Sequence, residues 1–251
     1  MTTDISSEGL TVLETGALKN GAPYNLVLLT AAQAQQAASF HHAIIDDLAL
    51  HEKTFMLPKT PAYFSHHLEK DGGNIIMAII SNGHVIAQSM VHHPTIREPD
   101  DGMVDLNLTL PFNKKSLFQA VAVSPAYRNQ GLVSIMVAHW LAQAQRHGKT
   151  HLLAEIDVRN APSWGNFLKA RMALVGIGVD SSDGTLVYNA HGILADVLKK
   201  RSASAFNAAA QKGYVCPAND IGKQKGLFSS GYVCTGYSKN PAALTFEQNA
   251  L

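Results

Sequence analysis

The stretch VAVSPAYRNQGLV, residues 121–133, decides the fold class, because it leads from a buried strand directly into a helix. Residues 117–123 are almost continuously apolar, which is typical of a strand covered on both faces, and the Ser-Pro pair at 124–125 ends it. From 132 to 144, apolar side chains recur at helical spacing, as in a helix that packs by one side. The sequence therefore predicts a strand, a turn at 128–131 and a helix.

This turn is a candidate anion site. The first backbone N–H groups of a helix have no partner within the helix and lie at the positive end of its dipole, so a pyrophosphate can accept several hydrogen bonds there. Gly131 allows phosphates to approach the backbone closely. The alternative is an ordinary strand-to-helix turn capped by a glycine.

Elements of both kinds flank the turn. Thr30 and Gln33 have the spacing of a capping box, which predicts a helix to about residue 50, and Asn82-Gly83 predicts a tight hairpin turn. The other expected elements are a strand at 24–29, a short helix after Pro61, strands at 75–80, 85–91, 104–110 and 152–158, a helix at 161–172, a hairpin of 174–179 with 185–188, and a helix-like segment at 193–210.

Composition bounds the class of protein. The 251 residues are 46% hydrophobic and 16% charged, which allows a large buried core. Twenty Lys and Arg against 19 Asp and Glu give a net charge of +1, so neither nucleic acid nor an anionic membrane is an expected partner. No apolar run is long enough to span a bilayer, and two cysteines, Cys216 and Cys234, are too few for a disulfide scaffold. We expect a soluble cytoplasmic protein.

A second motif follows one helix later, AEIDVRN at residues 154–160. Together the two motifs resemble the GNAT superfamily of acyl-CoA-dependent N-acetyltransferases. Arg128 and Gly131 match the family's acyl-CoA motif, whereas Val133 departs where the family usually has Gly or Ala. Glu155 and Asn160 match the family's next strand and the Asn that follows it.

The resemblance implies an α/β fold with a mixed, mostly antiparallel central sheet and helices on both faces. It covers residues 26–191 as one acyl-CoA-binding domain, after an N-terminal tail at 1–25. Residues 192–251 then form a C-terminal helix and strand extension, expected to pack on the same domain.

The resemblance also implies the co-substrate, acetyl-CoA or another acyl-CoA, and the acceptor, a small-molecule amine or a protein amino group. The pantetheine arm is expected to lie between residues 119–123 and 152–156. The implied cofactor-binding residues are Val121, Ala122, Val123, Arg128, Asn129, Gln130, Gly131, Leu132, Val133, Ser134, Asn160, Ser163 and Phe167.

Glu155 aligns with the general base of relatives that act on protein N-termini, and a carboxylate on an apolar strand should have a raised pKa. The alternative is a glutamate at the sheet edge paired with Lys or Arg. Many relatives carry a Tyr general acid where this chain has Phe167. Either the thiolate leaves unassisted, or Tyr188 or a histidine replaces that acid, or the domain binds acyl-CoA without turnover.

Histidine pairs occur at 41–42, 66–67 and 92–93, but their spacing does not favour a metal site, so no metal is expected. His92 and His93 would lie at the end of a strand beside an acidic loop that contains Asp105. The resemblance implies that the acceptor side of the site lies there, so these three residues are expected to bind the acceptor amine, although solvated carboxylates are the simpler interpretation of the loop.

The C-terminal segment repeats Gly-Tyr-Val-Cys at 213–216 and 231–234, interpreted as two similar edge strands around a loop at 222–226. The sequence thus predicts transfer of an acyl group, most simply acetyl, to an amine by direct attack on the thioester. The alternatives are a catalytically weak acyl-CoA-binding domain and a long-chain N-acyltransferase whose C-terminal segment covers an acyl tunnel. A homodimer is left open.

Overall fold

The computed structural model describes residues 3–5, 8–69, 74–95, 110–180, 183–202 and 213–248. It divides into two compact units, Met1–Thr95 with Ser116–Gln143 and Ile96–Lys115 with Ala144–Leu251. The predicted α/β class, with a largely antiparallel sheet and helices, is confirmed. Most of the predicted strand at 104–110 lies outside the described residues.

The strands of the first unit follow chain order, each antiparallel to its neighbour. They are β1 (Thr11–Ala17), β2 (Pro23–Leu28), β3 (Asn74–Ser81), β4 (His84–His92) and β5 (Lys115–Val123). The predicted hairpin turn joins β3 to β4, with Asn82 at φ +51° and Gly83 at φ +78°. The register therefore agrees with the turn that the sequence indicates.

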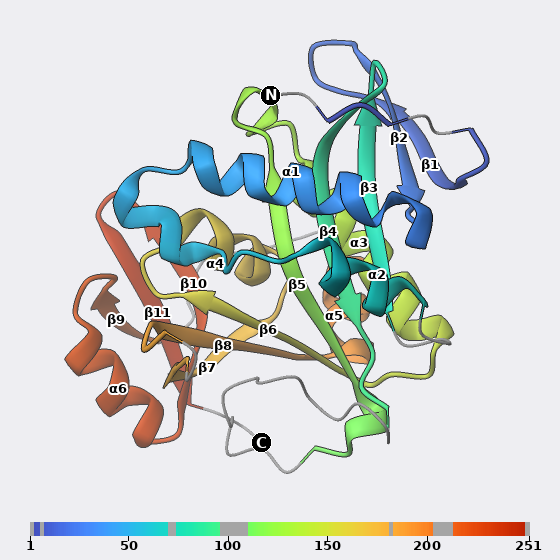
Figure 1. The fold of residues 1–251 in the computed structure, drawn as a ribbon. Coiled ribbons are helices and arrows are strands. Elements are labelled where there is room, and N and C mark those ends of the chain that lie inside the picture. The colour runs from blue at the N-terminus through green and yellow to red at the C-terminus, as the bar shows by residue number, and fades with distance from the viewer. Residues whose placement is uncertain are drawn as a thin grey trace. The chain divides into compact units, whose positions relative to one another are not determined.

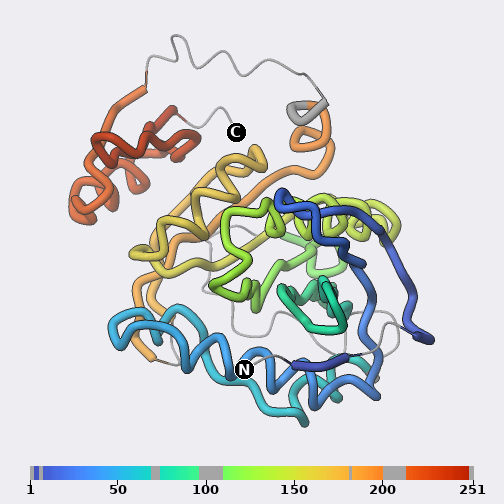
Figure 2. Tube along the Cα trace, turned by 90° about the horizontal axis from the view of Figure 1, so that it is seen from above, coloured from blue at the N-terminus to red at the C-terminus, as the bar shows by residue number. Residues whose placement is uncertain are grey.

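Helices cover both faces of these strands (Figure 2). Helix α1 (Ala34–Asp47), preceded by the 3₁₀ turn η1 (Ala31–Gln33), lies with α2 (Pro61–Glu69) on one side, and α3 (Leu132–Arg146) lies on the other. Short 3₁₀ helices occur at η2 (Leu50–Phe55), η3 (Phe112–Lys114) and η4 (Pro125–Tyr127). Because both faces are covered, β3 and β4 are buried along nearly their whole length.

Strand β1 corrects the prediction that the first residues form only a polar tail. Its Glu14 accepts a hydrogen bond from Tyr24 Oη on β2 at 2.5 Å and lies 2.8 Å from His139 Nε2 on α3. Gly16 has no side chain where a Cβ would lie 2.6 Å from Tyr24 Oη. The strand was missed because its polar residues make these contacts at the edge of the sheet instead of in a core.

The second unit has strand order β6-β8-β7-β10-β11-β9 (Figure 1). The strands are β6 (His151–Asp157), β7 (Ala173–Val179), β8 (Leu186–Ile193), β9 (Tyr214–Pro217), β10 (Tyr232–Lys239) and β11 (Ala242–Gln248). The helices are α4 (Ala161–Lys169), α5 (Leu194–Ser202) and α6 (Ile221–Ser229). The segment expected to be a loop at 222–226 lies within α6, whose N-cap Asp220 accepts from Lys223 N at 3.0 Å.

This unit contains one strand-helix-strand-strand arrangement twice. The first copy is β6, α4, β7 and β8, and the second copy is β9, α6, β10 and β11. Asn160 caps α4 by accepting from Ser163 N, and Asp220, 60 residues later, caps α6 in the same way. From its centre outward the sheet has β7 and β10, then β8 and β11, then β6 and β9. Such an order relates the two copies by a local two-fold axis.

The axis passes between β7 and β10. Leu174 and Cys234 are direct partners in that antiparallel pair, and they occupy equivalent positions of the two copies, again 60 residues apart. In an isologous contact, a residue of one copy faces the equivalent residue of the other copy. The Gly-Tyr-Val-Cys repeat instead compares β9 with β10 of one copy, and Cys216 and Cys234 are both free and buried.

Candidate active site

The turn between β5 and α3 has the backbone that its glycine predicts. Gly131 is at φ +85° and Asn129 at φ +64°, both in the left-handed region. The bond from Ile135 N to Gly131 O, at 3.2 Å, opens the ladder of α3, so the N–H groups of Leu132, Val133 and Ser134 begin the helix. The turn thus presents backbone donors at the positive end of a helix of 15 residues.

Lys19 also reaches this turn, a contact that no sequence motif predicts. Its backbone N donates to Gln130 Oε1 at 3.0 Å, and its Nζ donates to Asn129 O at 2.6 Å. Lys19 lies between β1 and β2, 111 residues before Gln130, within the segment interpreted as a tail. An ammonium group is therefore held beside the turn, in addition to the exposed Arg128.

The end of β5 is irregular. Gln88 of β4 pairs with Ala122 and Met90 pairs with Gln119, so two residues of β5 oppose one residue of β4. Ala120, at φ +49°, lies in this bulge. The predicted cofactor residues Val121 and Val123 are half-buried, and Ala122 belongs to the core under α1.

His92 and His93 point to different surroundings. His92 Nδ1 donates to Asn74 Oδ1, and Asn74 Nδ2 donates to His67 Nδ1 at 3.0 Å. His93 Nε2 lies 3.2 Å from Ser116 Oγ. The same Oγ accepts a hydrogen bond from the indole Nε1 of Trp140 on α3 at 2.7 Å. Both histidines are buried, and Asp105 lies outside the described residues. Their binding of an acceptor stays a prediction.

In the second unit, Glu155 lies on β6 directly opposite Asn189 of β8. Its side chain is half-buried. Asn160 Oδ1 caps α4 by accepting from Ser163 N at 3.2 Å, and Phe167 of the same helix is buried. The structure therefore explains Asn160 and Ser163 locally, as a helix cap. Their binding of acyl-CoA stays a prediction.

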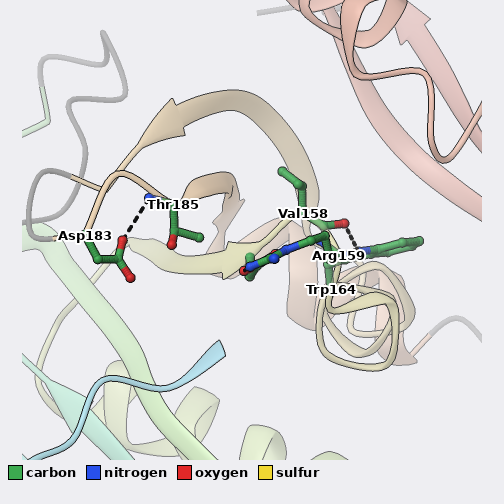
Figure 3. A network of polar contacts seen from close by, with 6 residues as sticks. Val158, Arg159, Trp164, Asp183 and Thr185 are labelled. Atoms are coloured by element: carbon green, nitrogen blue, oxygen red, sulfur yellow. Dashed lines mark hydrogen bonds and ion pairs between the residues drawn. The ribbon is translucent and has the colours of Figure 1, made fainter. Parts of the chain in front are cut away.

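Further hydrogen bonds hold the segment that leads from β6 into α4. Trp164 Nε1 donates to Val158 O at 3.1 Å, as Figure 3 shows. Asp157 accepts from both the backbone N and the Nε of Arg159, at 2.8 and 2.9 Å. The AEIDVRN motif is therefore a tightly bonded link between β6 and its helix.

Tyr188 is fully buried on β8, where its hydroxyl donates to Gln224 Oε1 of α6 at 2.5 Å. Burial is the main cause that raises its pKa above the ordinary value, and the nearby Cys234 adds to the shift. A general acid needs a proton that it can release to the leaving group. A buried hydroxyl with a raised pKa, already bonded to an amide oxygen, is poorly suited to that role.

A histidine pair on the same sheet was missed by sequence reasoning. His151 Nδ1 lies 3.1 Å from His191 Nε2, and the two rings stack. Burial first, and the neighbouring His151 second, lower the pKa of His191 to about 4. Both rings are therefore neutral near pH 7, because burial also lowers the pKa of His151. The spacing of 40 residues gives no local signal for this pair.

Among the described residues, no group of three or more His, Cys, Asp or Glu side chains could hold a metal ion. A helix long and apolar enough to cross a membrane is likewise absent from the described part of the chain.

One of the comparisons with known proteins identifies a family. A model of the acetyltransferase (GNAT) family matches residues 45–171, about half of the chain. The GNAT domain of S. lividans PAT has a TM-score of 0.53 at 17% identity, over 72% of this chain and 96% of that one. A search of curated proteins gives no match.

Two further solved structures have the same fold. A putative acetyltransferase from Salmonella typhimurium, determined with acetyl-CoA, gives a TM-score of 0.51 at 16% identity, covering 68% of this chain and 94% of its own. An N-acetyltransferase from Staphylococcus aureus Mu50 gives 0.52 at 14% identity, covering 68% and 98%. At these identities the likeness concerns the fold.

Proposed function

Since the chain belongs to the GNAT acetyltransferase family, we propose that it transfers an acetyl group from acetyl-CoA to an amine by direct attack on the thioester. The observation that carries the proposal is the turn between β5 and α3. It combines two left-handed residues, Asn129 and Gly131, with the ammonium group of Lys19. These are the features that suit a pyrophosphate.

We assign the phosphates to the backbone from Arg128 to Ser134, with Lys19 beside them. The side chain of Val133 leaves less room beside the phosphates than Gly or Ala would, but it removes no backbone N–H donor. It is therefore compatible with this assignment. The pantetheine arm is assigned to the backbone of residues 121–123, next to the bulge at Ala120, where the regular β4–β5 ladder is interrupted. Asn160, Ser163 and Phe167 complete the proposed contacts by resemblance to the family.

Glu155 is the proposed general base. It takes one proton from the acceptor ammonium, directly or through water, and the free amine then attacks the thioester carbonyl carbon. When the C–N bond has formed and the C–S bond breaks, the second amine proton goes to the departing thiolate. The products are an N-acetyl amine and CoA, and one proton leaves through Glu155.

The Tyr188 hydroxyl is hydrogen-bonded to Gln224. This contact favours a mechanism in which the CoA thiolate departs without a proton from a tyrosine general acid. A thiolate is a good leaving group because thiols are only weakly basic once ionised, with a pKa of about 8.5 for the cysteine thiol. The same observation, with Phe167 at the family's acid position, also favours the second candidate function, a catalytically weak acyl-CoA-binding domain.

The first experiment measures binding of acetyl-CoA and CoA by calorimetry, with Gly131→Glu and Gly131→Gln compared. Both substitutions force a side chain at φ +85°, so both carry the same backbone strain, and only Glu adds a negative charge. We expect Glu to weaken binding at least about tenfold more than Gln. Equal weakening by the two variants would contradict a phosphate site at the turn.

The second experiment measures CoA release with a panel of amines and of acetyl-, butyryl- and palmitoyl-CoA. We expect turnover with acetyl-CoA and its loss in Glu155→Gln without loss of acetyl-CoA binding. Tight binding without turnover of any amine would favour the weak binding domain. A preference for palmitoyl-CoA would favour long-chain transfer.

We also propose a cytoplasmic location, which two free and buried cysteines support, since thiols persist in a reducing compartment. Cell fractionation tests it. A homodimer and the domain bounds at 26 and 191 stay predictions.

A further inference from the structure

The two copies in the second unit allow an internal comparison of the same backbone with different side chains. In the first copy, Asn189 of β8 pairs with Glu155 on one side and with Gly176 on the other. In the second copy, Thr245 of β11 pairs with Val215 and with Gly236. A bulge precedes the glycine in both copies, so the positions correspond residue by residue.

The second copy therefore keeps the backbone and lacks the polar pair. Val215 takes the place of Glu155, and Thr245 takes the place of Asn189. The fold alone does not require a carboxylate and a carboxamide at these positions, because the second copy forms the same ladder without them. A requirement specific to the first copy must explain both residues.

Burying Asn189 costs free energy, and no hydrogen bond within the first copy offsets the cost of burying its Oδ1. The residue is 3% exposed, and its Oδ1 has no hydrogen-bond partner among the described residues. A buried amide oxygen without a donor destabilises a protein, and each such group in a native structure needs a reason. Direct partners on antiparallel strands share a face, so Asn189 lies on the same face as Glu155.

We propose that Asn189 binds the acceptor amine, with its Oδ1 accepting a hydrogen bond from the ammonium nitrogen that Glu155 deprotonates. This inference rests on the proposed function. Cβ atoms of such partners lie about 5 Å apart, so one nitrogen can reach both acceptors. A carboxylate and an amide oxygen suit a primary ammonium, which has three N–H donors and no acceptor. The site thus selects an amine over a hydroxyl acceptor.

The test replaces Asn189 by the residue of the second copy. In Asn189→Thr we expect unchanged calorimetric affinity for acetyl-CoA, and a KM for the amine raised about tenfold or more, because a hydrogen bond to a charged donor is lost. The matched control, Thr245→Asn, makes the reverse exchange in the second copy and should leave KM unchanged. Thermal unfolding of Asn189→Thr should occur at the same temperature or higher.

A readout independent of turnover uses n-butylamine as the probe. The side-chain amide ¹⁵N signal of Asn189, identified by its loss in Asn189→Thr, should shift when n-butylamine is added to the CoA-bound protein. No shift, or a lower unfolding temperature with an unchanged KM, would overturn the inference and give Asn189 a structural role. Loss of acetyl-CoA binding in the wild-type protein would instead count against the proposed function.

Discussion

Acidification should destabilise this protein through one buried imidazole, His191. The residue is 7% exposed, its ring stacks on His151, and its pKa is lowered from 6.5 to about 4. The unfolded chain therefore binds a proton near pH 6.5 that the folded chain does not accept until about pH 4. The stability that this group contributes is complete above pH 6.5 and is lost as the pH falls toward 4.

The size of the effect follows from the two pKa values. Between pH 7 and pH 5 the loss is about 2 kcal/mol, and the full loss by pH 4 is about 3 kcal/mol, at 1.36 kcal/mol per pKa unit. The depressed pKa of His151 acts in the same direction. Working between pH 7 and 5 limits the contribution of carboxylates, most of which protonate at lower pH.

The assay is urea unfolding at pH 7, 6 and 5 for the wild-type chain and for His191→Gln. The amide of Gln can bond to His151 and has no proton to gain in this range. We expect the wild-type free energy of unfolding to fall between pH 7 and pH 5 by about 2 kcal/mol more than that of the variant. Parallel curves for the two proteins would refute the argument.

Four further substitutions have defined outcomes, each measured by urea or thermal unfolding. Asn160→Ala and Asp220→Ala remove equivalent helix caps and should each cost about 1 kcal/mol, and a cost at only one site would contradict the equivalence of the copies. Tyr188→Phe leaves the buried Gln224 Oε1 without its donor and should cost about 1–3 kcal/mol while acetyl-CoA turnover persists; abolished turnover would restore the acid role. Ser116→Ala removes the acceptor of the buried indole N–H on α3, at a cost of about 1–3 kcal/mol, and unchanged stability would show that bond to be unimportant.

Local patterns predicted most of the fold. The apolar run of β5, the Asn82-Gly83 turn and the helical spacing of α3 each reflect a constraint on neighbouring residues, and the structure contains all three. Strand β1 was missed because Glu14 makes its stabilising contacts with β2 and α3, far along the chain. Helix α6 was missed because Gly222 and Gly226 suggested a loop, although the Asp220 cap supports a helix there.

The site could be predicted only where one segment carries it. The turn at Gly131 is local, so its motif is visible in the sequence. Lys19 joins it across 111 residues through a hydrogen bond that no spacing encodes. The pairing of Glu155 with Asn189 depends on strand register, which follows from the completed sheet. Burial of Tyr188 against Gln224 likewise required both copies to be present.

The local two-fold axis between β7 and β10 has a consequence for the way the chain reaches its native state. The two copies have the same backbone arrangement, so the strands and helices of one copy can pair wrongly with those of the other during folding. Such misassembly is typical of repeat proteins. Here the equivalents Trp164 and Gln224 differ, and Tyr188 corresponds to Leu244, so only one arrangement gives the buried hydroxyl its amide partner. The sequence differences between the copies thus destabilise mispaired folding intermediates, because each of these would contain a buried polar group without a hydrogen-bond partner.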